Sequence, residues 1–260
     1  MDHREVGRYW DENAETWTRL ARAGHDIYRD AVNTPAFLAM LPDVGGARVP
    51  DVGCGEGYNT RLLAERGAHV TAIDVAPRFI AHAVETERRE PRRIAYQIAS
   101  AVQLPFGNAR FDAVTAFMSL MDIPEPERAL AEAYRVLRPG GFLQFSISHP
   151  CFMTPHWKPV HDEQGNKIAV EVGDYFRDLN GEIDEWIFSN APPDARGEAR
   201  PFRIPRFTRT LSHWINHLLD LGFTIERLGE PYPSDEAVRA HPKLARARVV
   251  ADFLHVRVRK

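Results

Sequence analysis

The protein has 260 residues, of which 44% are hydrophobic, and it carries a formal net charge of −3 at pH 7. A chain of this length can bury one large core, whereas a mildly acidic balance argues against a nucleic-acid groove, which is usually basic. Two cysteines cannot build a disulfide framework, residues 1–5 lack a secretion pattern, and no apolar stretch approaches membrane-spanning length. We therefore expect a cytoplasmic enzyme, monomeric or homodimeric, with no nucleic-acid or membrane partner.

The first part of the chain is predicted to form amphipathic helices. Apolar side chains recur at helical spacing at Trp10, Ala14 and Trp17, and the pattern resumes at Phe37. We interpret residues 1–41 as an N-terminal helical cap.

A glycine-dense turn follows a short apolar run. Residues 49–52 are predicted to form a strand, residues 53–57 a tight turn and residues 60–67 a helix. Glycine lets the backbone approach a ligand closely, because no Cβ blocks that approach. A second predicted strand, residues 69–74, ends in the carboxylate of Asp74, where doubly wound folds place an acid that binds a ribose. The two features together predict a nucleoside-bearing cofactor.

The identity of that cofactor depends on two residues of the turn. The dinucleotide fingerprint needs a third glycine where this chain has Tyr58. It also does not ask for an acid at Asp51, two residues before the first glycine. A carboxylate in the turn suits a cationic ammonium or sulfonium and suits a pyrophosphate badly. A nicotinamide-dependent oxidoreductase on a similar sheet is therefore the disfavoured alternative.

Here the sequence resembles the class I S-adenosylmethionine-dependent methyltransferases, whose first motif is D-x-G-x-G-x-G. Asp51, Gly53, Gly55 and Gly57 match that motif, and Asp74 matches the acid that binds the ribose.

Three further features support the resemblance. Residues 104–106 and 111–117 resemble the L-P-F…F-D-x-V stretch of small-molecule methyltransferases, including those that methylate quinone precursors. Residues 132–141 resemble the family's helix-then-strand junction, in which Pro139 prevents the helix from continuing and a glycine pair leads into an apolar strand. The blocks also occur in the family's order, across roughly residues 45–150.

The resemblance implies S-adenosyl-L-methionine as cofactor and assigns residues to its binding. These residues are Asp51, Gly53, Cys54, Gly55, Gly57, Asp74, Val75, Ser100, Ala101, Phe117, Met118 and Ser119. Cys54 is expected to fill the turn and not to act as a nucleophile. Ser100 departs from the family pattern, since many relatives carry an acid there that contacts the adenine amino group. A hydroxyl accepts that hydrogen bond more weakly than a carboxylate does.

The expected fold is α/β and forms one domain: a Rossmann-like, doubly wound, mostly parallel seven-stranded sheet with an antiparallel edge strand. Residues 42–148 would form the cofactor-binding core. Residues 149–208 break the strand–helix rhythm and read as an insertion of short strands and loops after the fifth strand, placed to act as a lid over the site or as a dimerisation arm. Residues 209–260 would complete the core with a helix at 211–221 and strands at 223–228 and 249–258.

Two residues are candidates for catalysis. Asp122 follows the fourth predicted strand and is either a general base or amine anchor, or the cap of a helix beginning near Pro124. His149 follows the fifth strand and is either a base for a hydroxyl or thiol, or tied into the lid by a backbone hydrogen bond. The spacing of His149, Cys151 and His156 matches no closed four-ligand zinc pattern, and no metal is expected.

The acceptor is expected to be a small molecule, methylated by in-line displacement at the sulfonium methyl. The residues assigned to binding it are Tyr28, Met121, His149, Trp157, Tyr175 and Arg206. Arg206 belongs to the chain's one basic stretch and is either an anchor for an anionic acceptor or part of a solvated face. A non-catalytic protein that binds S-adenosylmethionine is the second alternative.

Overall fold

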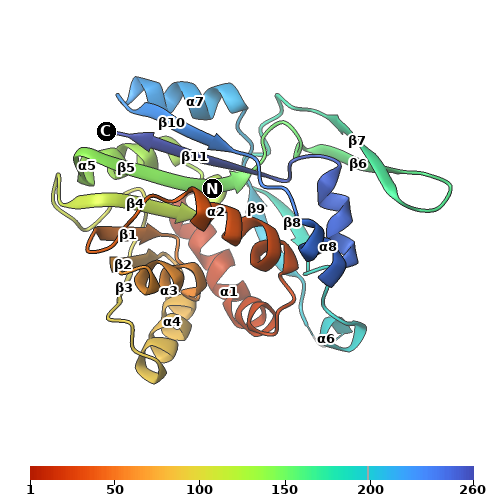
Figure 1. Ribbon diagram of the computed structural model, residues 1–260, viewed down its shortest axis with the longest axis horizontal. Coiled ribbons are helices and arrows are strands. Elements are labelled where there is room, and N and C mark those ends of the chain that lie inside the picture. The colour runs from red at the N-terminus through yellow and green to blue at the C-terminus, as the bar shows by residue number, and fades with distance from the viewer. Residues whose placement is uncertain (198) are drawn as a thin grey trace.

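A seven-stranded sheet with the strand order β10-β11-β5-β4-β1-β2-β3 organises the computed structural model, which describes residues 1–197 and 199–260 (Figure 1). Its strands are β1 (Arg48–Val52), β2 (His69–Asp74), β3 (Ala95–Ile98), β4 (Phe111–Phe117), β5 (Leu137–Ser148), β10 (Thr224–Gly229) and β11 (Phe253–Arg259). Strand β11 pairs antiparallel with both β5 and the edge strand β10, while β3, β2, β1, β4 and β5 are parallel. This confirms the predicted Rossmann-like, mostly parallel seven-stranded sheet. Its antiparallel strand, predicted at the edge, is β11, the second strand from that edge.

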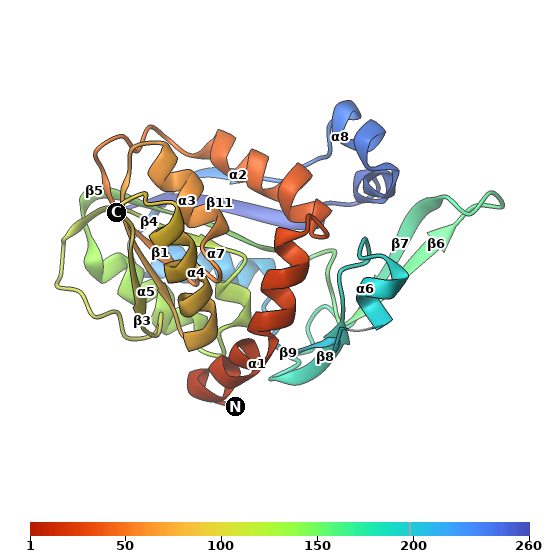
Figure 2. The same ribbon diagram turned by 90° about the horizontal axis from the view of Figure 1, so that it is seen from below.

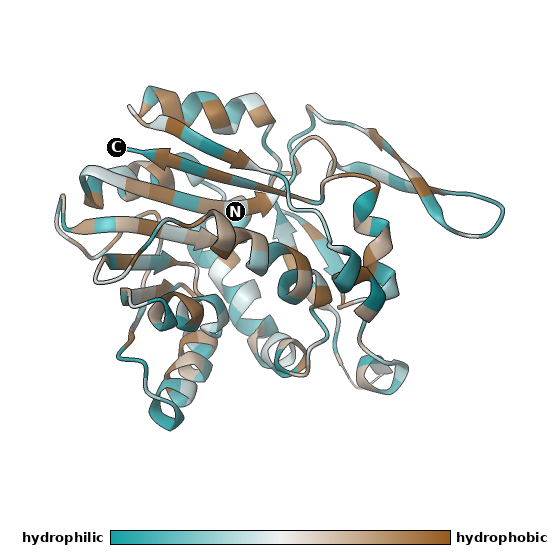
Figure 3. Ribbon diagram, viewed as in Figure 1, coloured by the Kyte–Doolittle hydropathy of each residue, from teal (hydrophilic) through white to brown (hydrophobic). Residues whose placement is uncertain are grey.

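Helices cover both faces of the sheet (Figures 1 and 2). The helical elements outside the insertion are α1 (His3–Arg22), the π-helical turn η1 (Arg29–Asn33), α2 (Thr34–Met40), α3 (Tyr58–Glu65), α4 (Pro77–Arg89), the short 3₁₀ turn η2 (Leu120–Asp122), α5 (Pro126–Val136), α7 (Leu211–Asp220), α8 (Asp235–Ala240) and the 3₁₀ turn η3 (Pro242–Arg248). Of these, α8 lies beyond the sheet and does not cover it (Figure 2). Hydrophilic and hydrophobic residues alternate along α4 and α7 (Figure 3), as expected for helices that bury one side. In the described part of the chain, no helix combines the length and apolarity needed to span a bilayer.

Strand β5 shows how alternation divides the core. Leu143, Phe145 and Ile147 belong to a buried cluster that contains Trp214 of α7. The residues between them point to the opposite face, since successive side chains of a strand alternate. There Gln144 Nε2 donates to the carbonyl of Phe37 at 2.7 Å. The face that carries Gln144 therefore receives α2 of the N-terminal segment.

Two element boundaries differ from the sequence expectation. Helix α5 ends at Val136, before Pro139, because Leu137 is already extended (φ −67°, ψ 136°) and starts β5. The last strand starts at Phe253 and not at residue 249. Residues 242–248 form η3, and Val249 keeps helical angles (φ −85°, ψ −41°), so the chain enters the sheet later than its apolar pattern suggests.

Between β5 and α7 the chain forms two separate two-stranded sheets. Strands β6 (His156–His161) and β7 (Lys167–Gly173) make a hairpin that projects from the body (Figures 1 and 2), and β8 (Glu182–Trp186) pairs with β9 (Phe202–Arg206). The short helix α6 (Pro193–Gly197) lies between β8 and β9.

Strand β9 is tied to α1. Asn13 of α1 donates to the carbonyl of Arg203 at 3.0 Å and accepts from its N–H at 3.1 Å. The N-terminal helix and the insertion therefore meet.

Candidate functional site

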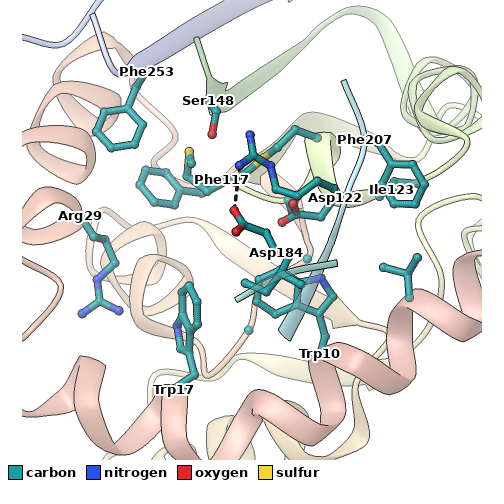
Figure 4. A pocket seen from close by; sticks show the side chains of 18 of the residues that line it. Trp10, Trp17, Arg29, Phe117, Asp122, Ile123, Ser148, Asp184, Phe207 and Phe253 are labelled. Carbon is teal, nitrogen blue, oxygen red and sulfur yellow. Dashed lines mark hydrogen bonds and ion pairs between the residues drawn. The ribbon is translucent and has the colours of Figure 1, made fainter. Parts of the chain in front are cut away.

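A cavity of about 610 Å³ lies at the carboxyl ends of the parallel strands, where open α/β sheets bind ligands. Its size falls within the usual range for small-molecule sites. Its walls come from the ends of β1, β2, β4 and β5, from the N-terminal segment and from the insertion. Figure 4 shows side chains of β4, β5, the N-terminal segment and the insertion around the same space, among them Phe117, Ser148, Trp17 and Asp184.

The glycine turn after β1 forms one end of the cavity. The buried carboxylate of Asp51 accepts hydrogen bonds from the hydroxyls of Thr60 at 2.6 Å and Thr115 at 2.8 Å. Burial raises the pKa of Asp51, while these two hydrogen bonds lower it. Gly53 has a φ of +71°, and a Cβ there would lie 2.3 Å from the Cβ of Ser119. Only glycine fits this position, because any side chain would overlap Ser119.

Asp74 at the end of β2 faces the same end of the cavity. One carboxylate oxygen accepts from the N–H of Gly55 and the other from the N–H of Ala76, each at 2.9 Å. Burial raises the pKa of Asp74 to about 6. Each oxygen keeps a further lone pair, so the carboxylate can accept the two hydroxyls of a diol while it holds the turn.

Most of the other residues assigned to the cofactor also lie on the cavity wall. They are Cys54, Val75, Ser100, Ala101, Phe117, Met118 and Ser119. Burial raises the pKa of the Cys54 thiol well above its ordinary value, which agrees with a filling role and not a nucleophilic one. Gly57 is not on the wall. A Cβ at Gly57 would lie 2.6 Å from the hydroxyl of Tyr96, so this glycine permits packing behind the turn.

Asp122 borders the opposite end of the cavity, near Ile123 and Phe207 (Figure 4). Burial raises its pKa to about 7, against a lowering by the charge of Arg206. No hydrogen bond to its carboxylate is found in the described residues. Asp122 lies in η2, and helix α5 starts only at Pro126 after the N-cap residue Glu125, so the alternative that Asp122 caps this helix is wrong.

His149 does not line the cavity, and its contacts match the alternative in which a backbone hydrogen bond ties it into the lid, so its predicted catalytic and acceptor-binding roles gain no support. The residue is buried, and its neighbours Ser148 and Pro150 line the cavity while it does not. Its Nδ1 accepts from the N–H of Cys151 at 3.2 Å, and its Nε2 lies 3.0 Å from a carboxylate oxygen of Glu230. Nδ1 therefore carries no proton and Nε2 donates to Glu230. Both nitrogens are engaged away from the cavity.

Four of the remaining residues assigned to the acceptor line the cavity: Tyr28, Met121, Tyr175 and Arg206. Arg206 pairs with Asp184 at 2.9 Å, the contact dashed in Figure 4. Trp157 does not line the cavity. It lies on β6 of the hairpin, where the ammonium of Lys167 stands 5.0 Å from its ring centre, so the assignment of Trp157 to the acceptor is wrong.

Sequence reasoning missed an aromatic wall and a charged group. Trp17, which the sequence showed only as part of a helical repeat, packs edge-on against Trp186 of β8 at 5.5 Å, and both rings border the cavity. Arg29 of η1 stacks on the ring of Tyr58 at 4.0 Å, and its Nη1 lies 3.4 Å from a carboxylate oxygen of Glu56 in the glycine turn. The helical spacing of Trp17 could not show that it borders a cavity, because the opposite part of that wall comes from the insertion.

Comparison with known proteins identifies the family. A model described as a methyltransferase domain matches residues 50–145. The crystal structure of an S-adenosylmethionine-dependent methyltransferase from Mesorhizobium loti aligns with a TM-score of 0.69 and 28% identity, covering 87% of this chain and 96% of that one. Residues 50–145 thus belong to the methyltransferase domain family, and the fold of the whole chain is similar to that of an S-adenosylmethionine-dependent methyltransferase.

Curated relatives match a little more than half of this chain. A demethylmenaquinone methyltransferase from Tropheryma whipplei (strain Twist) is 32% identical over 160 residues, which cover 58% of this chain and 66% of the relative. A ubiquinone biosynthesis O-methyltransferase from Pseudomonas entomophila (strain L48) is 33% identical over 158 residues, 56% and 63% of the respective chains. The chain thus spans slightly less than two thirds of the length of these relatives.

The residues present fit the cofactor of this methyltransferase family. The buried Asp74 offers two free lone pairs to a ribose, and the turn at Gly53 leaves no room for a side chain between itself and Ser119. Tyr58 stands at the first position of α3, where a dinucleotide-binding protein needs its third glycine. The nicotinamide alternative is therefore not favoured. Within residues 1–197 and 199–260 no cluster of three or more metal-ligating side chains occurs.

Proposed function

We propose that the protein transfers a methyl group from S-adenosylmethionine to a small-molecule acceptor. The observation that carries this proposal is the continuity of one cavity. Asp51 and Asp74 line it beside the glycine turn, and Asp122, Arg206 and aromatic side chains line the same cavity. A protein that only bound the cofactor would not need these additional side chains on the wall.

The chemistry needs little beyond alignment. The cofactor supplies a methyl group already activated by the positive charge on sulfur. The chain has to hold the acceptor in line with that group, which can contribute up to about 7–11 kcal/mol in ideal cases. Asp122 is the group we propose to take a proton from an acceptor that must lose one, because burial raises its pKa to about 7, near the operating range of a general base.

Two features support a small acceptor. The cavity of about 610 Å³ has to hold both cofactor and acceptor. The relatives from Tropheryma and Pseudomonas carry names of quinone-biosynthesis methyltransferases, and quinone precursors are small molecules. The net charge of −3 supports the absence of a nucleic-acid partner. Two free cysteines support a cytoplasmic location, and we propose a monomer or homodimer.

We further propose that residues 1–41 and 149–208 act as two parts of one cover over the core. Support comes from the side chains that both segments place on the cavity wall and from the hydrogen bonds between Asn13 and Arg203. The core would then be formed by residues 42–148 and 209–260 within a single domain.

Calorimetry with S-adenosylhomocysteine and, in parallel, with NADH tests the proposal. Heat of binding with the first ligand and none with the second is expected. Turnover of S-adenosylmethionine in the presence of a library of phenols, amines and thiols then tests catalysis. Tight binding of NADH alone would refute the donor. Binding of S-adenosylhomocysteine without turnover of any acceptor would favour the non-catalytic alternative.

A further inference from the structure

The π-helical turn η1 places polar side chains on the cavity wall. Its closing bond runs from the N–H of Thr34 to the carbonyl of Arg29, five residues back. π-Helical turns are rare and occur frequently at functional sites. Tyr28, Arg29 and Asn33, from the start and end of this turn, all line the cavity. Of these, Asn33 is the most buried, with 1% of its surface exposed.

Two partners far away in sequence orient the amide of Asn33. Its Oδ1 accepts from the hydroxyl of Ser146 at 3.0 Å and lies 2.5 Å from Nε2 of His255. Burial lowers the pKa of His255 to about 4, so the ring is neutral and donates its Nε2 proton to this oxygen. No acceptor for the Nδ2 group occurs in the described residues. The buried amide thus keeps both N–H donors for the cavity that it lines.

The register of β5 and β11 locates this donor. Ser146 pairs with His255, and the next pair towards the cavity on the same face is Ser148 with Phe253. Both Ser148 and Phe253 point into the cavity (Figure 4). Strands β5 and β11 lie on the other side of β4 from β1 and β2, which carry the acids of the cofactor end. Asn33 therefore lies on the other side of β4 from the two acids of the cofactor end, where we place the acceptor.

We propose that Asn33 is a specificity-determining residue whose amide donates a hydrogen bond to an oxygen of the methyl acceptor. A carbonyl, carboxylate or phenolate oxygen would satisfy it, whereas an ammonium group would not, since it has no lone pair to offer. Ser146 and His255 are positioning residues that act through Asn33. This inference rests on the proposed function and names the class of its acceptor.

A pair of isosteric probes tests the amide directly. Acetophenone and α-methylstyrene differ only in a carbonyl oxygen replaced by a methylene group. We measure the dissociation constant of each by ligand-observed NMR, with the full-length protein saturated with S-adenosylhomocysteine. The preference of the wild type for acetophenone should exceed that of Asn33→Leu by about 2- to 10-fold, the range for one net hydrogen bond. Asn216→Leu makes the same change on the exposed side of α7 and should keep the preference.

Other readouts keep the test decisive if Asn33→Leu fails to fold. Asn33→Asp keeps the shape but replaces the donors with an acceptor, so it should disfavour acetophenone. In the wild type, the Asn33 side-chain NH₂ resonances should shift with acetophenone and not with α-methylstyrene. An equal preference in wild type and variant, or no binding of acetophenone, would overturn the inference. A tenfold loss of S-adenosylhomocysteine affinity in Asn33→Leu would assign the amide to the cofactor instead. Failure of the wild type to bind S-adenosylhomocysteine would refute the proposed function itself.

Discussion

At the scale of single residues, Asp74 links the glycine turn to the site. Its two oxygens already accept from the N–H groups of Gly55 and Ala76, and the residue lines the cavity. Asp74→Asn turns one acceptor into a donor and brings it against a backbone N–H. We expect a loss of S-adenosylhomocysteine affinity of about 10-fold or more, as for a charge-assisted hydrogen bond.

Calorimetry measures this effect, with Asp43→Asn as the matched control. Asp43 also accepts from a backbone N–H, that of Gly45 at 2.9 Å, but on an exposed loop away from the cavity. If both variants bind S-adenosylhomocysteine as the wild type does, Asp74 does not hold the ribose.

The pKa of Asp122 makes a prediction about stability. Burial raises this pKa to about 7 in the folded protein, above the unfolded value of about 4. Between about pH 4 and pH 7 the folded state keeps a proton that the unfolded state has lost. The free energy of unfolding therefore falls as the pH rises through this window, and the contribution of the protonated carboxyl is lost above about pH 7. Asn cannot ionise, so Asp122→Asn should melt about 8–16 °C higher than the wild type at about pH 8 and nearly alike at about pH 4, since about three pKa units amount to about 4 kcal/mol.

Thermal unfolding followed by circular dichroism across this pH range gives the measurement. Glu163→Gln, at an exposed position of the hairpin, should show no such pH-dependent gain. A constant difference between Asp122→Asn and the wild type at every pH would contradict a raised pKa.

At the scale of elements, Glu56 fastens the glycine turn to the N-terminal segment. Its side chain is buried, and its oxygens lie 3.4 Å from Nη1 of Arg29 and 3.5 Å from Nε of Arg22. Glu56→Gln leaves two guanidinium groups with no charge to pair at this position, and breaking a buried ion pair is costly. We expect amides of residues 22–33 to exchange with deuterium about 10-fold faster or more, because their local opening becomes easier.

Hydrogen–deuterium exchange by mass spectrometry resolves this segment. Glu65→Gln removes a partner of Arg92 at the surface, where the pair spans 3.4 Å, and should leave residues 22–33 unchanged. Equal exchange in the Glu56 variant and the wild type would show that the charges do not fasten the turn.

Local patterns predicted the elements better than they predicted the site. The turn over Asp51 and Gly53 and the strand ending at Asp74 are local, since their function follows from residues a few positions apart. The sequence left two roles open for His149, because its position after β5 does not determine where the ring points. That direction depends on Glu230, 81 residues away. Asn33 went unnoticed for the same reason, since its partners lie 113 and 222 residues away.

At the scale of the whole molecule, the β6–β7 hairpin stands apart from the sheet. Its strands pair with each other only, and Val160 and Ile168 are exposed on it. Replacing residues 161–168 with Asn-Gly keeps Val160 opposite Ala169 and closes the hairpin with a two-residue turn. We expect a melting temperature within about 2 °C of the wild type, as for surface changes, and the same affinity for S-adenosylhomocysteine.

Sedimentation velocity on the shortened protein tests whether the β6–β7 hairpin is a dimerisation arm. If the tip of the hairpin, residues 161–168, serves neither folding nor assembly, the shortened protein should sediment with the same oligomeric state as the wild type. A wild-type dimer that becomes a monomer would instead identify the tip as a dimerisation device.

The cavity draws its two ends from different stretches of chain. The end around Asp51 and Asp74 comes from the core, whereas rings such as Trp17 and Trp186 come from the first helix and from the insertion. Sequence divergence in the first helix and the insertion can therefore change the acceptor, while the residues that bind the cofactor stay the same. We therefore expect that grafting residues 149–208 into a homologous protein would change the choice of acceptor and leave cofactor binding unchanged.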